Sequence, residues 1–429
     1  MIIRLLNNIT SKKYSIFILA TIGLIIALFF TFIVYPSISQ QYNAVLDPDL
    51  HGNLGYGLLK TGTLAFHPDT EPTLVRGPVY PIFIAFCLAI SNGLWPYSIQ
   101  FAQCILFALI ILTMFFTAKT IWNRNVAFIA SVLCTLHPFL IWYTSRIWVE
   151  LFAAFLLILH YWALSLFFKK PSYKTALIVG VMGGILALTK QTFLFFTIII
   201  PLFMLCIKID NRKIPIRQSM ILIFASFIII LPWTARNYAI SGKIIPVHLL
   251  AGINLQIGDG VTEGFINSSS MDKRLSFAYL WDISLQRRSE IYKKFPEKIS
   301  LWEKEYKADK EMIAQSFSRY AKEPFFLIKK IILNSWMFWI LGENLKKTMI
   351  ISVIQLPILI FFLISFALII VKKKFFTIKG LFFILPLIYY MLHLPIVCNA
   401  RYSSVLAPVM IMCCVTFLES RLSDSSNTK

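Results

Sequence analysis

Residues 14–35, YSIFILATIGLIIALFFTFIVY, form a predominantly apolar run without a charged side chain. A helix of about 20 such residues is long enough to span the hydrocarbon core of a bilayer. Basic residues precede the run, which is too long for the core of a signal peptide and lacks a convincing small-residue cleavage site. We therefore expect it to remain as a membrane anchor.

The rest of the chain has the same character. Of its 429 residues, 58% are hydrophobic and only 14% are charged, whereas a typical soluble domain has about 25% charged residues. The mean hydropathy is +0.73, which excludes soluble, disordered and collagen-like classes. The net charge is +21, but the Lys and Arg residues lie mainly between apolar runs. Membrane topology explains them better than nucleic-acid binding, which we do not expect.

The pattern predicts an all-α polytopic membrane protein with about ten transmembrane helices. One further apolar segment, residues 80–90, is short enough to be interfacial or re-entrant. The expected spans are residues 14–35, 96–118, 125–143, 148–168, 174–189, 191–208, 218–235, 350–371, 377–395 and 402–419.

Whether residues 80–90 cross the membrane decides the orientation of every later loop. If they do not cross, most Lys and Arg of the short loops and the ends fall on one side, among them Arg4, Lys12, Lys13, Arg421 and Lys429. Basic residues in short loops prefer the cytoplasm. We therefore predict that both termini are cytoplasmic and that two long loops lie on the outer side.

This topology divides the chain into three parts. We expect residues 1–240 to form a transmembrane core whose first outer loop covers residues 36–95. Residues 241–349 are expected to form a long outer subdomain, and residues 350–429 the last transmembrane helices and a cytoplasmic tail. The seven Cys residues show no CxxC spacing, and the six His residues show no metal-ligand pattern.

The predicted topology places acids and cations at one membrane face, where ionisable residues usually mark a site or a pathway. Acidic and basic side chains together suit a reaction in which an anionic group leaves and a hydroxyl or amine loses a proton. Phosphate is the natural anion, because Arg and Lys bind its oxygens well. The candidate residues are Asp47, Asp49, Arg76, Glu150, Lys190, Arg236 and Arg401.

Each candidate also has a structural explanation. Lys190 and Arg236 are compatible with long side chains that extend from helix ends to the interface. Asp47 and Asp49 flank Pro48, which is typical of a turn, and Glu150 at a helix start is favoured by the helix dipole. Composition alone does not separate these alternatives from a functional site.

Several short strings in this order resemble integral-membrane glycosyltransferases of the GT-C fold. That family uses polyprenyl-phosphate sugars and includes protein O-mannosyltransferases and the aminoarabinose transferase of lipid A. The similarity covers about residues 10–260 and, weakly, 385–420. The strings are DPDLH (47–51), RGPVYP (76–81), HPFLIWYTSRIWVE (137–150), GGILALTKQTFLFF (183–196), LPWTARN (231–237) and ARYSSVLAPVM (400–410).

Three positions depart from the family pattern. His51 stands where an aromatic residue is usual, Gly77 replaces one of two prolines, and Pro48 adjoins the presumed catalytic acid. These differences leave the choice between Asp47 and Asp49 open, although the spacing favours Asp47.

The resemblance implies a GT-C-like helical bundle that transfers a sugar, with inversion, from a polyprenyl-phosphate donor on the outer face. It implies Asp47 as general base, Asp49 as a secondary acid, and Arg76, Lys190, Arg236 and Arg401 as ligands of the donor phosphate. Glu150 would orient the acceptor or help bind a divalent cation, and metal use stays open.

The same resemblance implies a bacterial inner-membrane protein, in contact with membrane lipids, with a periplasmic active site. The acceptor is left open between a lipid, a glycan and a protein. The alternative function is a transporter or flippase of lipid-linked or anionic substrates, since such pathways also use charged helix ends. The two halves of the sequence show no matching symmetry to favour it.

Overall fold

The computed structural model describes residues 14–42, 46–206, 208–209, 212–296 and 298–418. The basic residues Arg4, Lys12, Lys13, Arg421 and Lys429, on which part of the topology prediction rests, lie outside these ranges.

The first half of the described chain consists of helices joined by turns and by one longer loop, residues 62–78, and helices also form the second half, so the all-α prediction is confirmed. One antiparallel pair of two-residue strands, β1 (Lys208–Ile209) and β2 (Arg212–Lys213), interrupts the first half. The helices are α2 (Ser15–Phe29), the π-helix η1 (Phe30–Val34), α3 (Tyr35–Tyr42), α4 (His51–Thr61), α5 (Val79–Ile90), α6 (Tyr97–Ile121), α7 (Arg124–Thr135), α8 (Pro138–Thr144), α9 (Val149–Lys169), α10 (Tyr173–Thr189), the 3-10 helix η2 (Gln191–Phe195), α11 (Phe196–Cys206) and α12 (Ile216–Ser241).

The second half begins with the segment that was expected to form an outer subdomain. Its helices are α13 (Ala251–Asn267), α14 (Met271–Arg274), α15 (Phe277–Lys293), α16 (Leu301–Lys322), α17 (Pro324–Ile340), α18 (Leu345–Val371), α19 (Ile378–His393), α20 (Ala400–Ser404), α21 (Ala407–Cys414) and the 3-10 helix η3 (Val415–Leu418).

Five helical stretches in the described residues are long and apolar enough to cross a membrane: Ser15–Gln40, Tyr97–Ile121, Val149–Lys169, Ile216–Ser241 and Leu345–Val371. The bent pair α7 and α8, with an angle of 56°, makes a sixth if it is one span. The other four expected spans coincide with shorter apolar helices. Membrane character is therefore supported, while ten spans remain a prediction.

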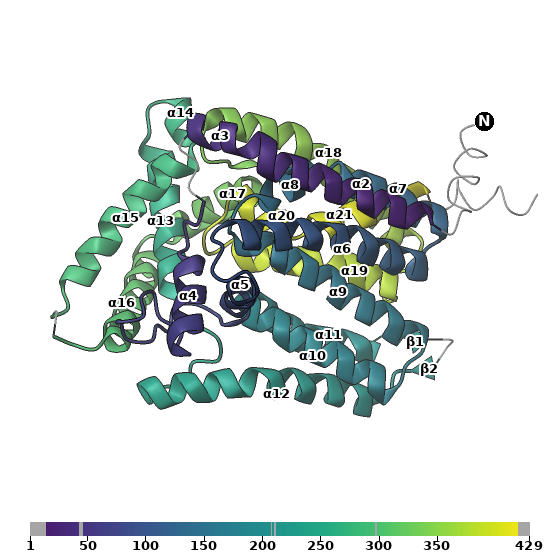
Figure 1. Ribbon diagram of the computed structural model, residues 1–429, viewed down its shortest axis with the longest axis horizontal. Coiled ribbons are helices and arrows are strands. Elements are labelled where there is room, and N and C mark those ends of the chain that lie inside the picture. Colours follow the sequence, from purple (N-terminus) through teal and green to yellow (C-terminus); the bar gives the residue numbers. More distant parts are fainter. Residues whose placement is uncertain (1–13, 43–45, 207, 210–211, 297, 419–429) are drawn as a thin grey trace, which may run out of the picture.

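The long helices lie side by side and form an elongated bundle (Figure 1). Helices α13, α15 and α16 gather at one end, and the β1–β2 pair lies at the other (Figure 1). Helix α10 packs closely on α12 because Gly180 has no side chain: a Cβ there would lie 2.5 Å from the carbonyl oxygen of Leu222. Small residues permit such close contact between membrane helices.

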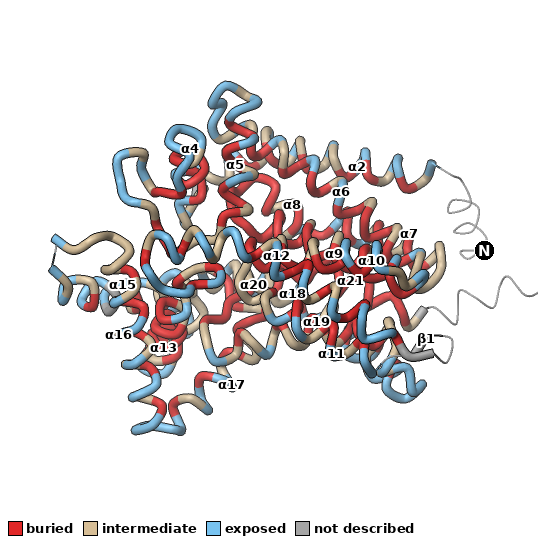
Figure 2. Tube along the Cα trace, turned by 90° about the horizontal axis from the view of Figure 1, so that it is seen from below, coloured by how far each residue is buried: buried red, intermediate tan, exposed pale blue. Residues whose placement is uncertain are grey.

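The core lies inside the bundle, where α9 is buried on nearly all sides (Figure 2). The outer faces of η1, α12 and α18 instead carry exposed apolar side chains; Ile33, Ile228 and Val353 are 62%, 65% and 75% exposed. A water-soluble protein rarely exposes such extended apolar surfaces, whereas lipid covers them at no cost. This distribution agrees with a membrane protein.

Candidate active site

The two acids of the first long loop lie directly before α4. Leu50, between them and the helix, adopts a left-handed conformation with φ of 56°, which is strained for a residue with a side chain. This turn directs the Asp47 carboxylate at the helix start, where it accepts hydrogen bonds from the backbone nitrogens of His51 (3.0 Å) and Gly52 (2.6 Å). Asp47 therefore also has a capping role at the start of α4, whereas the structural alternative drawn from the sequence was a turn around Pro48.

The surroundings of Asp47 and Asp49 drive their pKa values in opposite directions. Burial raises the pKa of Asp47 to about 6, although its two backbone hydrogen bonds favour the charged form. Burial also disfavours ionised Asp49, but the guanidinium groups of Arg401 and Arg76 more than offset it and hold the pKa of Asp49 below its ordinary value. At neutral pH Asp49 is therefore ionised. Asp47 gains or loses its proton much closer to neutral pH, because its pKa is raised to about 6.

Four ion pairs connect five of the predicted residues into one cluster, which we call the Arg401 cluster: Asp49, Arg76, Glu150, Lys190 and Arg401. Arg401 pairs with Asp49 and with Glu150, at 2.9 Å from the latter. Arg76 lies 3.4 Å from Asp49, and Lys190 lies 3.1 Å from Glu150. Three cations thus face two acids, so the cluster has one positive charge in excess.

Aromatic rings support the two cations that reach Glu150. The Arg401 guanidinium lies 4.3 Å from the centre of the Trp148 ring, and the Lys190 ammonium lies 5.1 Å from that of Tyr402. Such cation–π contacts stabilise a positive charge that has lost water. Trp148 and Tyr402 therefore help to hold Arg401 and Lys190 in place, a role that the sequence did not reveal.

Arg76 reaches the cluster because its segment passes very close to the end of α10. A Cβ on Gly77 would lie 2.2 Å from the carbonyl oxygen of Leu188, so this contact requires glycine. Leu188 precedes Lys190 by two residues, and the contact therefore brings two phosphate-ligand candidates together. This also explains why Gly77 departs from the proline of the family pattern.

The residues before Arg76 are held by α16 and by the segment that precedes α13. The buried carboxylate of Glu305 accepts hydrogen bonds from the Thr73 hydroxyl (2.5 Å) and the Leu74 backbone nitrogen (2.8 Å). The Leu74 carbonyl accepts one from Leu249 (2.8 Å). Glu305 thus anchors the segment that carries Arg76.

Arg236 is not part of the Arg401 cluster. Its guanidinium donates to the Thr73 carbonyl (2.9 Å) and the Asn237 side chain (3.0 Å), and lies over the Trp233 ring. In this structure Arg236 supports the segment that carries Arg76, and its role as a phosphate ligand stays a prediction.

Two histidines that the sequence did not single out as site residues lie at the same place. Burial lowers the pKa of His51 and of His248 to about 3, so both rings are neutral. His51 packs edge-on against Tyr80, with ring centres 5.0 Å apart. The positive charge of Arg76 further lowers the pKa of His248. His248 lies in a loop without a recognisable motif, so the sequence gave no indication that it belongs to this region.

Some buried polar atoms of this region have no hydrogen-bond partner among the described residues: His51 Nδ1, Arg76 Nε, Glu150 Oε2 and His248 Nδ1. Leaving such atoms unpaired is costly unless a ligand or water satisfies them. The region is therefore prepared to receive a polar group that donates and accepts hydrogen bonds.

A divalent cation does not fit the described side chains. Asp49 and Glu150, the strongest oxygen ligands of the cluster, already face Arg76, Lys190 and Arg401. In the described ranges, three or more His, Cys, Asp or Glu side chains nowhere surround a common point. Arg76, Lys190 and Arg401 therefore compete with a metal ion for Asp49 and Glu150.

Part of the sequence matches a known protein family. Residues 72–235, which include Arg76, Glu150 and Lys190, match the model of the dolichyl-phosphate-mannose-protein mannosyltransferase family. None of the curated proteins matches the chain by sequence.

Two structures of oligosaccharyltransferase from Archaeoglobus fulgidus share the fold. One, tethered to an acceptor peptide with the NVT sequon, gives a TM-score of 0.57 at 15% identity and covers 96% of this chain and 50% of its own. The other is AglB in complex with an inhibitory peptide and a dolichol-phosphate. It gives a TM-score of 0.53 at 13% identity and covers 97% of this chain and 52% of its own.

The chain therefore spans about half the length of these solved structures. At such low identity the likeness shows the fold alone, while the family match adds sequence similarity over the centre of the chain. The predicted resemblance to the GT-C glycosyltransferases is confirmed: the chain has their fold, and residues 72–235 are similar to their dolichyl-phosphate-mannose-protein mannosyltransferase branch.

Proposed function

We propose that this protein is an integral-membrane glycosyltransferase that moves a sugar from a polyprenyl-phosphate donor to an acceptor on the outer face of a bacterial inner membrane. Asp47 takes a proton from the acceptor hydroxyl or amine. The freed acceptor atom attacks the anomeric carbon, the bond from that carbon to the phosphate oxygen breaks, and the configuration is inverted. The electron pair leaves with the polyprenyl phosphate.

The single observation that carries this proposal is the excess cation of the Arg401 cluster. A sugar phosphodiester has one negative charge, which offsets the one positive charge of the five ion-paired side chains; ionised Asp47, the proposed base, lies outside these pairs and adds a negative charge that interacts with Arg76. When the sugar leaves, charge develops on the phosphate oxygen, and fixed cations nearby stabilise it without reorganising. Arg76, Lys190 and Arg401 are the proposed phosphate ligands, and Arg236 acts through the segment that carries Arg76.

The opposite pKa shifts of the two loop acids support separate roles. A general base works best when its pKa lies near the operating pH, which applies to Asp47 at about 6. Asp49 is paired with two guanidinium groups and is a weaker base. We assign Asp49 to holding Arg76 and Arg401, and Glu150 to orienting Lys190 and, through its free oxygen, the acceptor.

Donor consumption tests the proposal directly. The purified protein is incubated with a panel of polyprenyl-phosphate sugars, and released polyprenyl phosphate is measured for wild type and for Asp47→Asn. We expect release by wild type and a roughly 100- to 10,000-fold loss in the variant, the usual contribution of a general base. Asp69→Asn, the same chemical change at an exposed position of the same loop, is the matched control and should retain the rate.

Thermal unfolding of both variants separates catalysis from capping, because the amide side chain of Asp47→Asn keeps only one acceptor oxygen for the start of α4. Asp47→Asn should bind donor and remain folded. Equal release by wild type and a folded Asp47→Asn variant would contradict the assignment of the base, and absence of release from every donor would contradict the enzyme.

A further inference from the structure

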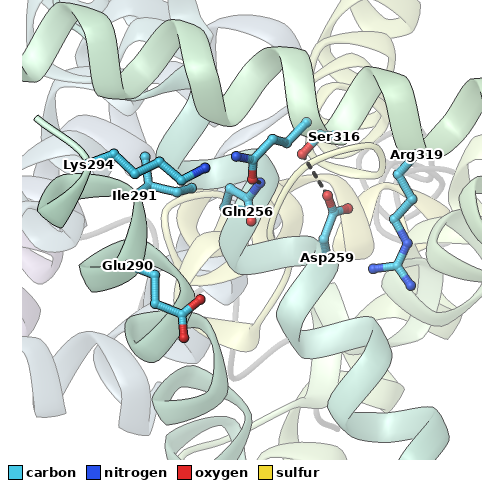
Figure 3. Close-up of a pocket in the computed structure, with 8 residues that line it drawn as sticks. Gln256, Asp259, Glu290, Ile291, Lys294, Ser316 and Arg319 are labelled. Atoms are coloured by element: carbon cyan, nitrogen blue, oxygen red, sulfur yellow. Dashed lines mark hydrogen bonds between the residues drawn. The ribbon is translucent and has the colours of Figure 1, made fainter.

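A second polar pocket lies away from the Arg401 cluster, between α13, α15 and α16 (Figure 3). Its volume is about 330 Å³, within the size range of small-ligand sites. Gln256 and Asp259 come from α13, Glu290 and Lys294 from α15 and its C-terminal end, and Gln315 and Arg319 from α16. The proposed reaction gives this pocket no role.

The lining favours an uncharged polar ligand. Lys294 pairs with Glu311, Arg319 pairs with Glu263, and Asp259 pairs with the buried Lys330, so no cation of the lining is in excess. A phosphate site would instead require an excess of cations. Ile291 is the one apolar side chain among the lining residues, which leaves little for the apolar side chains of a peptide.

Gln256 supplies a donor that is only loosely engaged, whereas the amide nitrogen of Gln315 donates a hydrogen bond to Glu311 (2.6 Å). The Gln256 amide nitrogen lies 3.4 Å from the Met312 carbonyl and 3.5 Å from the Gln315 amide oxygen, both at the limit of a hydrogen bond. Sugar hydroxyls donate and accept at once, and therefore match amide and carboxylate side chains placed on several sides.

The floor of the pocket is rigid. The buried Asp259 carboxylate accepts hydrogen bonds from Ser316 (2.6 Å), Tyr320 (2.6 Å) and Lys330 (2.7 Å), and the first of these is drawn in Figure 3. Lys330 is completely buried and lies on α17. A preorganised floor of this kind binds a ligand at a lower cost in ordering.

The floor is connected to the segment that leads to Arg401. Asn334, one helical turn after Lys330 on α17, donates to the carbonyls of Leu394 (2.7 Å) and Ile396 (2.9 Å). A Cβ on Gly258 would lie 2.1 Å from the Ile396 carbonyl, so α13 touches the same segment. Arg401 follows this segment by five residues.

Helix α13 spans the interval between the two sites. It begins just after Leu249, which is bonded to Leu74 near Arg76. At a rise of about 1.5 Å per residue, Asp259 lies roughly 12 Å along the helix from its start. Helix α13 therefore links the pocket to the segment that positions Arg76.

We propose that the pocket between α13, α15 and α16 binds a neutral carbohydrate, the part of the acceptor remote from the reacting hydroxyl. Its role as an acceptor subsite rests on the proposed glycosyltransferase function, whereas carbohydrate binding itself does not. Gln256 and Gln315 contact the sugar, and Asp259 holds the floor.

The test is calorimetric titration of the full chain in nanodiscs, because maltoside detergents carry the same sugar chemistry. The probes are lactose, maltose, N,N′-diacetylchitobiose and a neutral peptide. We expect at least one saccharide to bind to wild type and the Gln256→Leu/Gln315→Leu double variant to bind about tenfold more weakly, through the loss of two hydrogen bonds. Gln286→Leu, on the exposed part of α15, is the matched control and should bind as wild type.

Failure to bind any of the three saccharides, equal binding by the double variant, or preferred binding of the peptide would overturn the proposal. Asp47-dependent donor release, measured on the same samples, keeps the two proposals apart. Release without saccharide binding refutes the pocket alone, and saccharide binding without release refutes the glycosyltransferase alone.

Discussion

Two buried groups of ion pairs in this protein differ in how completely they are satisfied. In the pocket floor, one acid, Asp259, meets one cation, Lys330, and two hydroxyl groups, and neither ionic side chain has a polar atom without a partner. In the Arg401 cluster three cations meet two acids, and Glu150 Oε2 and Arg76 Nε have no hydrogen-bond partner among the described residues. Balance indicates a structural pair, whereas excess charge and spare polar atoms indicate a site for a ligand.

Breaking the balanced pair should have the largest effect, and the effect should be on stability. Lys330→Met leaves the Asp259 carboxylate buried without its cation, which typically costs about 3–5 kcal/mol. Denaturant unfolding in detergent measures this loss of stability. The matched control, Lys329→Met at the exposed neighbouring position, should change the free energy of unfolding little. Adding Asp259→Asn should recover much of the loss. A stable Lys330→Met single variant would contradict the structural role.

Removing the excess cation should instead affect turnover. Arg401→Met leaves two cations for two acids, and no charge remains to balance the donor phosphate. We expect donor release to fall about 100- to 1,000-fold, the usual effect of losing one preorganised charge donor. Arg401→Lys keeps the positive charge but lacks the planar guanidinium group that contacts both Asp49 and Glu150. Its rate of donor release should lie between those of wild type and Arg401→Met. Full activity of folded Arg401→Met would show that the excess charge is not used.

The pH dependence of donor release distinguishes the two loop acids. Ionised Asp47 is the proposed base, and burial raises its pKa to about 6. The rate should therefore level off above pH 6 and fall about tenfold per pH unit below it. Asp49, whose pKa is lowered by Arg401 and Arg76 against the effect of burial, should not contribute to this limb. A rate independent of pH down to about 4 would favour Asp49 as the base.

Loss of one anchor of the Arg76 segment should have a smaller effect. Glu305→Gln keeps one acceptor oxygen for Thr73 and Leu74 and loses the other, a difference of about 1 kcal/mol. We expect donor KM to rise about fivefold with little change in kcat. Glu303→Gln, on the same helix and paired only with Lys307 among the described contacts, is the matched control. A change in kcat alone would place Glu305 elsewhere in the reaction.

Metal removal should have no effect. Arg401 stands between Asp49 and Glu150, where a divalent cation would need those oxygens. Dialysis against EDTA should leave donor release unchanged, and added Mg²⁺ or Mn²⁺ should not stimulate it. Loss on chelation with recovery on adding metal would contradict the arrangement of this cluster.

Most of the fold could be predicted because each apolar run is a local signal. All ten expected spans correspond to helices or helix pairs, and the short run at 80–90 is the helix α5. The count of membrane crossings could not be fixed from length alone, since α10, α11, α19 and α21 are shorter than a bilayer-spanning helix. Orientation relied partly on basic residues outside the described ranges and remains a prediction.

The site could be predicted only in part, because pairing across the sequence leaves no local signal. The spacing of ionisable residues identified Asp49 and Arg401, but not that they form an ion pair. Arg236 has the same signal as Arg76 but contacts the Thr73 carbonyl instead of an acid of the Arg401 cluster. Lys330 does have a local signal, because a lysine within an apolar helix usually has a buried partner or a function.

The most direct test of the charge argument compares two donors that carry the same sugar and the same polyprenyl chain, one through a monophosphate and one through a diphosphate. Release of the lipid phosphate is measured for wild type and Asp47→Asn under identical conditions. One excess cation matches the single charge of the monophosphate diester, so we predict Asp47-dependent consumption of that donor and little of the other. Preferential consumption of the diphosphate donor would contradict the proposed role of the Arg401 cluster.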